Sequence, residues 1–456
     1  MKAQSIQTAI QTALEAVYGI TLLRGVLESE AGRAMLTLLL ALAESEPDEA
    51  AVAAAYSQTF NALASAANGN EMVCGIPDAW QAYLVTSILD DTNPWSVQAE
   101  RVGTTGVATA IREQAGRDLR ALRLLFDLTA QTIWDVTCHT IAASMPGLRD
   151  AWVPWYNLAP SGLPRLLLSA RDAFGHTMIA CEDWYTLVDP LTQHWAQHGT
   201  GLFAYYHVLR WQGRAEGLSG IAHPDPIQLS GLIGYEREQA LLRANLERFL
   251  HGLPAHDAVL YGAPGTGKSS TVKALVNTYA NQGLRLVEVR KEQVEDLPWI
   301  IAQLRDRAPH FLIFIDDLSF EAHETEYKAL KVLLEGSEEA RPHNVLIYAT
   351  TNRLNLIREQ FSERGKPTDD IHWRDTMEEK QSLVARFGLR VTFATPDQEC
   401  YLKIAGALAQ QRGLQLSEEE LRACALQWER QHAGRSGRLA RQFVDELQAE
   451  QTLSRR

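Results

Sequence analysis

The sequence has few cysteines, and their spacing gives them no shared structural task. There are five in 456 residues, an odd number, and no two of them form a C-x-x-C pair. This pattern excludes a disulfide framework and a cysteine-based zinc site, since both need paired or clustered ligands. We therefore expect reduced, packed thiols, as in a cytoplasmic protein. The five are Cys74, Cys138, Cys181, Cys400 and Cys424.

Long apolar runs and an excess of positive charge are also absent. The most apolar run, residues 34–43, is far shorter than the roughly 20 residues that cross a membrane. The N-terminus has no apolar segment typical of a secretory signal, so the predicted localisation is cytoplasmic, without a membrane partner. The 43 basic residues are outnumbered by 56 acidic ones, for a net charge of −13. This excludes a protein that coats nucleic acid, although not a local basic channel.

Lysine is rare, and its distribution separates the first 220 residues from the rest. After Lys2 this part contains no lysine, and it holds eight of the eleven tryptophans, which we expect to pack in its core. Stretches at 5–17, 33–43, 49–67 and 106–130 place apolar residues at helical spacing. Residues 1–220 are therefore predicted to form a mostly α-helical domain. No chemistry is recognisable in it, and the acidic balance favours an unknown protein partner over DNA.

The pattern changes after the two prolines of IAHPDPIQ, at residues 221–228. From there, short and almost continuous apolar runs alternate with helical stretches. Such runs are typical of strands buried on both faces, and parallel strands need crossovers long enough for a helix. The sequence therefore predicts an α/β sheet covered on both sides. The predicted strands are Ala258–Tyr261, Leu284–Val289, Phe311–Ile315, Val345–Ala349 and Leu389–Phe393.

A complete phosphate-binding motif, G-x-x-x-x-G-K-[ST], follows the first run. Its glycines let backbone N–H groups converge on one anion, and a helix beginning at about Gly267 adds its partial positive charge. Lys268 is expected to contact the β- and γ-phosphates, and the hydroxyl of Ser269 to ligate Mg²⁺. The predicted phosphate-binding residues are Gly262, Ala263, Pro264, Gly265, Thr266, Gly267, Lys268, Ser269 and Ser270.

Polar residues end the third and fourth runs. Asp316 is expected to hold Mg²⁺ through its water shell, and Asp317 to polarise the attacking water. The fourth run ends in TTN, where Asn352 is placed to position that water. Glu321 and Glu288 are alternatives to Asp317 as the base.

Two arginines are candidates for contacts with the transferred phosphate. Arg386 lies just ahead of the fifth run and is expected to act on the nucleotide of a neighbouring subunit, as arginine fingers do. Arg438 opens a helical stretch from which it would reach the γ-phosphate, with Arg435 and Arg441 as alternatives. Between these arginines and the fourth run, the polar segment 362–380 is expected to be a surface insertion.

Together these motifs resemble those of AAA+ ATPases. The resemblance identifies GAPGTGKS as Walker A, Asp316-Asp317 as Walker B, Asn352 as sensor 1, Arg386 as the arginine of the RFG box and Arg438 as sensor 2. The strings IDDLSFE, ARFG and RSGR are similar to those of predicted ATPases in the family called domain of unknown function 815.

The resemblance covers roughly residues 226–450 and implies a fold and its ligands. The implied fold is a five-stranded parallel sheet in the order 5-1-4-3-2 with a helical lid, and the implied cofactors are ATP and Mg²⁺. The string LSGLIGYERE is similar to the linker that packs on adenine in such proteins. By that similarity the adenine contacts are Leu232, Ile233 and Gly234.

Four segments are thus predicted: the helical domain 1–220, a linker on the adenine side at 221–240, the nucleotide-binding core 241–394 and the lid 395–456. The leading hypothesis is an ATPase that remodels or regulates a macromolecular partner as a ring-shaped homo-oligomer. Many AAA+ proteins have Glu where this sequence has Asp317, so we expect slow hydrolysis. Two alternatives stay open: an ATP-dependent switch or scaffold with little turnover, and a nucleic-acid loader related to helicase loaders.

Overall fold

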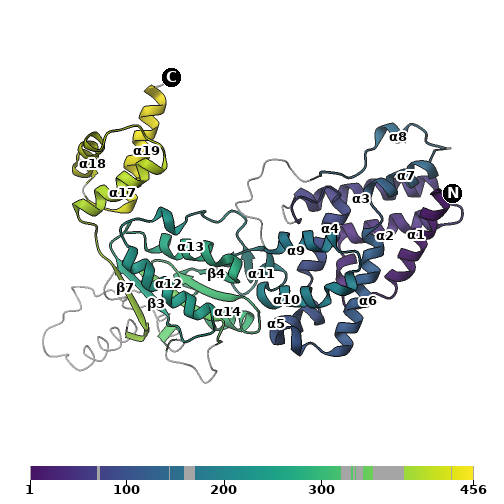
Figure 1. Cartoon of the computed structure of the whole chain (residues 1–456), viewed down its shortest axis with the longest axis horizontal. Coiled ribbons are helices and arrows are strands. Elements are labelled where there is room, and N and C mark those ends of the chain that lie inside the picture. The colour runs from purple at the N-terminus through teal and green to yellow at the C-terminus, as the bar shows by residue number, and fades with distance from the viewer. Residues whose placement is uncertain are drawn as a thin grey trace. The chain divides into compact units, whose positions relative to one another are not determined.

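The chain divides into two compact units in the computed structural model (Figure 1). Unit 1 comprises Met1–Tyr205 together with Arg307–Pro309, and unit 2 comprises Tyr206–Asp306 together with His310–Arg456. The structure describes residues 2–68, 72–142, 144–158, 170–319, 330–331, 334, 342–352, 385–432 and 434–454.

Unit 1 is helical, as its periodicity predicted. Several of its helices begin at a side chain that accepts a hydrogen bond from the first turn, such as Ser29 before α2 and Asp78 before α4. None of the helices that the structure describes is both long and apolar enough to cross a membrane. The elements are α1 (Lys2–Val17), η1 (Arg24–Leu27), α2 (Glu30–Ala43), α3 (Glu49–Asn68), α4 (Ala79–Asp90), α5 (Pro94–Gly106), α6 (Thr109–Phe126), α7 (Ala130–Thr140), α8 (Leu148–Ala151), α9 (Ala170–Ala180), η2 (Trp184–Leu187), α10 (Val188–His198) and α11 (Leu202–Tyr205).

Tryptophans form the centre of the core of unit 1. The indole N–H groups of Trp80, Trp184 and Trp195 donate to backbone carbonyls at 2.9, 2.9 and 2.8 Å. All three side chains are fully buried. Burial of a large aromatic side chain is favourable when its polar atom finds a partner, as it does here. These three tryptophans therefore serve packing, as expected.

A buried carboxylate on α6 fixes the chain just after α1. Asp118 is fully buried, and one of its oxygens accepts from the backbone N–H groups of Thr21, Leu22 and Leu23 at 3.1, 2.7 and 3.0 Å. Its other oxygen accepts from the Gln114 amide at 2.8 Å. These donors replace the water that a buried carboxylate loses.

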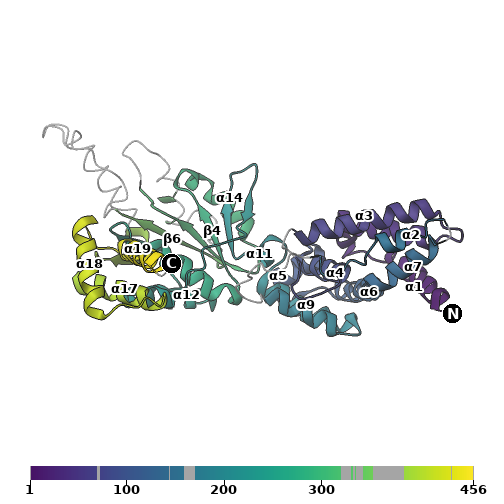
Figure 2. The same cartoon turned by 90° about the horizontal axis from the view of Figure 1, so that it is seen from above.

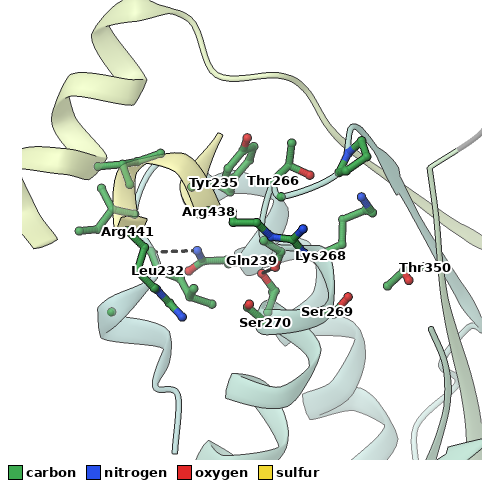
Figure 3. Close-up of a pocket in the computed structure, with 18 of the residues that line it drawn as sticks. Leu232, Tyr235, Gln239, Thr266, Lys268, Ser269, Ser270, Thr350, Arg438 and Arg441 are labelled. Atoms are coloured by element: carbon green, nitrogen blue, oxygen red, sulfur yellow. Dashed lines mark hydrogen bonds between the residues drawn. The ribbon is translucent and has the colours of Figure 1, made fainter. Parts of the chain in front are cut away.

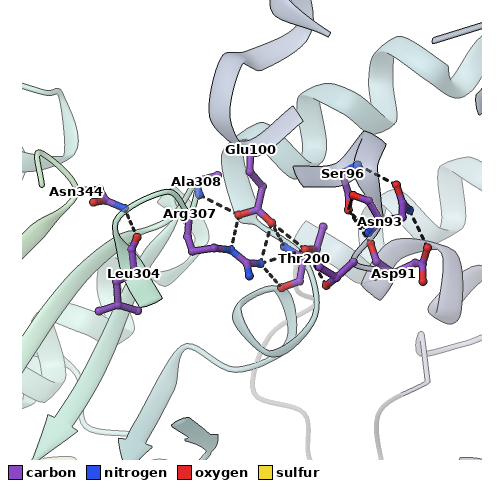
Figure 4. Close-up of polar contacts among 10 residues, drawn as sticks. Asp91, Asn93, Ser96, Glu100, Thr200, Leu304, Arg307, Ala308 and Asn344 are labelled. Atoms are coloured by element: carbon purple, nitrogen blue, oxygen red, sulfur yellow. Dashed lines mark hydrogen bonds and ion pairs between the residues drawn. The ribbon is translucent and has the colours of Figure 1, made fainter. Parts of the chain in front are cut away.

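A second buried carboxylate holds the segment Arg307–Pro309 within unit 1 (Figure 4). The side chain of Glu100 on α5 is 2% exposed, and it accepts from both Nε and Nη2 of Arg307 at 2.8 Å. The backbone N–H of Ala308 and the hydroxyl of Thr200 donate to the same carboxylate at 3.0 and 2.8 Å. The charge of Glu100 is thereby paired and its oxygens are satisfied, which a buried ion pair requires.

Unit 2 contains one sheet of seven strands, in the order β2-β1-β4-β5-β6-β3-β7. All neighbours are parallel except the antiparallel pair of β1 and β2. The strands are β1 (Val208–Trp211), β2 (Leu218–Gly220), β3 (Ala258–Gly262), β4 (Leu284–Val289), β5 (His310–Ile315), β6 (Val345–Thr351) and β7 (Leu389–Phe393).

The predicted sheet was therefore wrong in its number of strands and in its complete order. The five apolar runs do form β3 to β7, and these follow one another as β7-β3-β6-β5-β4. The addition is the β1–β2 hairpin, in which β1 pairs with β4, from Val208 beside Leu286 to Arg210 beside Glu288. These strands have only four and three residues, too few to show a periodicity. Because of this hairpin, unit 2 begins at Tyr206 rather than near the predicted 220.

Helices cover both faces of the sheet. Leu242 and Leu246 of α12 and Leu275 of α13 pack in one apolar cluster with Leu260 and Phe314 of the strands. Figure 2 shows α12 and α14 on opposite sides of β4 and β6. The intervening elements are η3 (Leu229–Gly231), α12 (Glu236–Leu250), α13 (Lys268–Tyr279), η4 (Ala280–Gln282), η5 (Lys291–Asp296) and α14 (Leu297–Leu304).

Three helices after the sheet form a separate apolar cluster, in the region predicted as the lid. Tyr401 and Ile404 of α17 pack there with Phe443 of α19, and Ile233 of the linker before α12 packs against the same cluster. The helices are α17 (Gln398–Gln411), α18 (Glu418–His432) and α19 (Gly437–Ser454).

Replacing Asp118 with Ala should lower the stability of the protein strongly. The change leaves the backbone N–H groups of residues 21–23 without their acceptor, at a cost of about 3 kcal/mol or more. Thermal unfolding of the full chain measures the loss. Asp135→Ala is the matched control, because that exposed carboxylate on α7 accepts from the neighbouring Gln131 amide. Equal midpoints for the two variants would contradict the role given to Asp118.

Candidate functional site

The phosphate-binding motif lies between a strand and a helix, the context that such a motif requires. Strand β3 ends at Gly262, and α13 begins at Lys268. Two glycines are needed for geometric reasons. A Cβ at Gly262 would lie 2.1 Å from the carbonyl oxygen of Phe393 on β7. Gly267, at the helix N-cap, has a left-handed φ of 93°. The loop can therefore turn tightly against the sheet and present the helix N-terminus.

A cavity of about 550 Å³ opens over this loop (Figure 3). Residues from the linker, the loop, the ends of β5 and β6, and the lid line it together. Its lining consists of Gly231, Leu232, Ile233, Tyr235, Gln239, Pro264, Gly265, Thr266, Gly267, Lys268, Ser269, Ser270, Thr271, Asp316, Asp317, Thr350, Asn352, Ile404, Leu408, Gly437, Arg438 and Arg441.

Most of the predicted site residues lie in this lining, but not all. Gly262 and Ala263 contribute through their carbonyl groups, which accept from the Lys268 ammonium. Gly234 is not in the lining; its N–H donates to the Glu236 carboxylate at 3.3 Å, and its carbonyl oxygen is 3.8 Å from the Cys400 thiol. Of the three residues predicted to contact adenine, Leu232 and Ile233 line the cavity and Gly234 does not.

Lys268 is buried and fully hydrogen-bonded. Only 6% of the residue is exposed. Its Nζ donates to the carbonyls of Gly262 and Ala263 at 2.8 and 2.9 Å and to Oδ1 of Asn352 at 2.9 Å. Burial lowers the pKa of the ammonium group, while the carboxylates of Asp316 and Asp317 act in the opposite direction. An entering phosphate can replace these three neutral acceptors with charged ones.

Asp316 and Ser269 provide hard oxygen donors beside the phosphate loop. The Ser269 hydroxyl donates to Oδ1 of Asp316 at 2.6 Å, and the Thr350 hydroxyl donates to the same oxygen. In the part of the chain that the structure describes, no group of three or more His, Cys, Asp or Glu residues could hold a metal. A donor set of one hydroxyl and one carboxylate fits Mg²⁺, which takes its remaining ligands from water and nucleotide phosphates.

Asp317 has an unusual backbone that Thr350 supports. Its φ is 52°, in the left-handed region, and its N–H donates to Oγ1 of Thr350 at 2.9 Å. The next N–H, of Leu318, donates to the Thr350 carbonyl at 2.7 Å. Asp is one of the few side chains that tolerate this conformation. This backbone gives a physical reason for Asp, rather than Glu, at this position.

The Asn352 side chain bridges the ammonium group of Lys268 and the carboxylate of Asp317. Its Oδ1 accepts from Lys268, and its Nδ2 donates to Oδ1 of Asp317 at 2.8 Å. Since an amide has one accepting and one donating end, the two bonds fix its orientation. The side chain is otherwise exposed, so it is accessible from the cavity.

Among the three arginines considered for the lid, two line the cavity. Arg438 and Arg441 are in the lining, and the backbone N–H of Arg438 donates to the carbonyl of Gly265 at 3.3 Å. Arg435 is bound to Glu429 at 2.7 Å and is not in the lining. Arg386 precedes β7 and also lies outside the lining.

The two alternative bases differ in what can be said of them. Glu288 on β4 is paired with Arg210 at 2.9 Å and with Lys273 at 3.7 Å, and it is absent from the lining of the cavity. Glu321 and the segment 362–380 lie outside the described residues.

Thr350 and Gln239 are among the lining residues that the sequence did not single out. Thr350 could have been suspected, because it is the first polar residue after the fourth apolar run. Gln239 gave no signal, because one glutamine in the charged helical stretch EREQALLRANLERFL resembles any other exposed residue.

Several solved structures are similar to this chain. The Holliday junction branch migration motor RuvB of Thermotoga maritima is 17% identical, with a TM-score of 0.35 over 50% of this chain and 67% of RuvB. The AAA domain of FIGL-1, solved in complex with ADP, is 19% identical, with a TM-score of 0.35 over 49% of this chain and 73% of that domain. Among curated proteins, none matches this chain.

A family model described as "Protein of unknown function (DUF815)" matches residues 204–451. The match includes the whole sheet of unit 2, the phosphate loop and most of α19. It spans more than half of the 456 residues. The relationship predicted from IDDLSFE and its companion motifs is confirmed, and the chain belongs to the DUF815 family.

Proposed function

We propose that this protein is an ATPase of the AAA+ type, which binds ATP with Mg²⁺ in the described cavity and hydrolyses it. The observation that supports this proposal most strongly is a set of hydrogen bonds among residues that line the cavity. In it, the Asn352 amide joins Lys268 to Asp317, while Ser269 and Thr350 both donate to Asp316. A phosphate-binding cation, a pair of metal-binding oxygens and a base are thus adjacent.

Binding would begin at the loop between β3 and α13. The helix N-terminus and the N–H groups of the loop attract the phosphates, and Lys268 exchanges its carbonyl acceptors for phosphate oxygens. Ser269 and Asp316 would hold Mg²⁺, which neutralises phosphate charge when it is bound. From the lid, Arg438 and Arg441 add two positive charges to the same cavity.

Hydrolysis needs a water molecule that is oriented and partly deprotonated. Asp317 is the proposed base, and the Asn352 amide, bound to its carboxylate at 2.8 Å, is placed to orient the same water. The hydrogen bond from Asp317 N–H to Thr350 fixes the carboxylate relative to β6. Thr350 is therefore a positioning residue in this proposal.

We further propose that the protein acts as a ring-shaped oligomer on a macromolecular partner that unit 1 selects. Arg386 lies outside the lining of the cavity, as a residue that serves a neighbouring subunit would. The mass of the particle with and without ATP tests the assembly. A nucleotide switch with little turnover is the competing function; steady-state phosphate release separates the two, because repeated turnovers per subunit exclude the switch.

Lys268→Ala should abolish phosphate release. Loss of the charge that stabilises the phosphates in the transition state costs about 100-fold or more in turnover. The measurement is phosphate release at saturating ATP and Mg²⁺. Lys273→Ala is the matched control on the same helix, since Lys273 pairs with Glu288 outside the cavity. A Lys268→Ala protein that turns over like the wild type would refute the proposed site.

Asp317→Asn should reduce turnover about 100-fold or more and leave ADP binding almost unchanged, because the amide keeps the volume but is a poor base. Asp317→Glu should not hydrolyse ATP faster than the wild type, because the glutamate would have to adopt the left-handed backbone conformation of residue 317. Phosphate release and ADP affinity of both variants are compared with those of Asp225→Asn, a change at an exposed loop carboxylate. Normal turnover of Asp317→Asn would transfer the role of base to another residue.

Arg386→Ala should reduce turnover by about 1,000-fold without weakening ADP binding, the result expected for an arginine supplied to a neighbouring active site. The control is Arg390→Ala, at an exposed position of β7. Mixing Arg386→Ala with Lys268→Ala subunits is a further test, because mixed rings would regain some activity where each variant supplies what the other lacks. Full activity of Arg386→Ala alone would remove the intersubunit site from the proposal.

A further inference from the structure

The cavity extends from the phosphate loop to an end with a different chemical character. Leu232 of the linker and Ile404 and Leu408 of α17 are apolar residues of the lining, from the region where Ile233 of the linker packs against the apolar cluster of the lid helices. Apolar side chains from two directions suit the flat faces of a nucleobase, but they cannot distinguish one purine from another. Discrimination requires a polar group with a defined orientation at the edge of the base.

Outside the phosphate loop, α13 and the strand ends, the polar side chains of the lining are those of Tyr235, Gln239, Arg438 and Arg441. The Tyr235 hydroxyl donates its proton to the carbonyl of Ala394 at 2.7 Å, so it has no donor left for a ring nitrogen. The two arginines have donors only, so they cannot accept a hydrogen bond from an amino group. Of these four side chains, Gln239 is the one that can offer a base both an acceptor and a donor.

The orientation of the Gln239 amide is fixed by the linker. Its Nε2 donates to the carbonyl of Leu232 at 3.0 Å, the bond drawn beside these residues in Figure 3. A rotation that exchanged nitrogen and oxygen would place two acceptors against each other, so Oε1 keeps its position. Gln239 is partly exposed, and within the described ranges no residue donates to Oε1. The cavity is therefore presented with an oriented acceptor.

We infer that Gln239 is the residue that selects adenine. Its Oε1 accepts a hydrogen bond from the 6-amino group of the base, and the second hydrogen of its Nε2 is available to an adjacent ring nitrogen, the pairing that glutamine makes with adenine elsewhere. Guanine and hypoxanthine have a carbonyl oxygen at position 6, which would oppose Oε1. This inference rests on the proposed function and assigns the residue that distinguishes adenine from other purines in that site.

The test measures the affinities of the full chain for ADP, GDP and IDP with Mg²⁺. Diphosphates avoid hydrolysis, and IDP differs from ADP only at the edge of the base. Wild type should bind ADP about tenfold or more tightly than GDP and IDP. In Gln239→Met, which keeps the length of the side chain, ADP affinity should fall to that of the other two, while GDP and IDP affinities stay within about twofold.

Two further variants separate recognition from a general loss of structure. Gln239→Leu should show the same loss of preference, and both variants should unfold at the wild-type temperature. Gln228→Met is the matched control, because the exposed Gln228 lies outside the cavity and donates to the Pro226 carbonyl at 3.5 Å. It should keep the full preference for ADP.

The outcomes distinguish this inference from the function on which it rests. Wild type that binds none of the three diphosphates would remove the proposed function itself. Wild type that binds all three equally, or a Gln239→Met protein that still prefers ADP, would overturn the role of Gln239 and leave the ATPase proposal intact. A parallel loss of affinity for all three in both variants would likewise overturn it, since that pattern indicates a structural role.

Discussion

The arrangement of the site depends on the hydroxyl group of Thr350. It donates to the Asp316 carboxylate and accepts from the N–H of Asp317, so one side chain on β6 determines where two acidic residues after β5 lie. This is feasible because β5 and β6 are parallel neighbours, with Ile315 beside Ala349. Carboxyl ends of adjacent parallel strands meet at one edge of a sheet, where ligands of such folds usually bind. The phosphate loop follows β3, the neighbour of β6 on the other side.

Local sequence was sufficient for the parts of the molecule whose chemistry is local. The phosphate loop needs a glycine at 262 for its close approach to β7 and a glycine at 267 for a left-handed backbone. Both glycines belong to the phosphate-binding motif, which can be recognised in the sequence. Apolar runs predicted β3 to β7 because most of these strands are largely buried. Helical periodicity likewise predicted α1, α2, α3 and α6 of unit 1.

The features that the sequence did not predict depend on distant pairing. Strand β1 is four residues long and is a strand because β4 offers it a free edge. Gln239 matters because a linker carbonyl seven positions away orients its amide. Arg435 is bound to Glu429 and lies outside the lining of the cavity, whereas Arg438 belongs to the lining. None of these partners has a characteristic spacing from the residue it affects, so composition and motifs could not identify them.

The bond between the backbone N–H of Arg438 and the carbonyl of Gly265 joins the first turn of α19 to the middle of the phosphate loop. Because both atoms belong to the main chain, replacing the Arg438 side chain leaves this link in place unless the new residue is proline. Movement of the loop would therefore be transmitted to the C-terminal helix mechanically, whatever the charge at that position. In an Arg438 variant that lacks the guanidinium group, α19 could still move when the cavity is occupied. The effect of the substitution on turnover could then be measured separately from its effect on that movement.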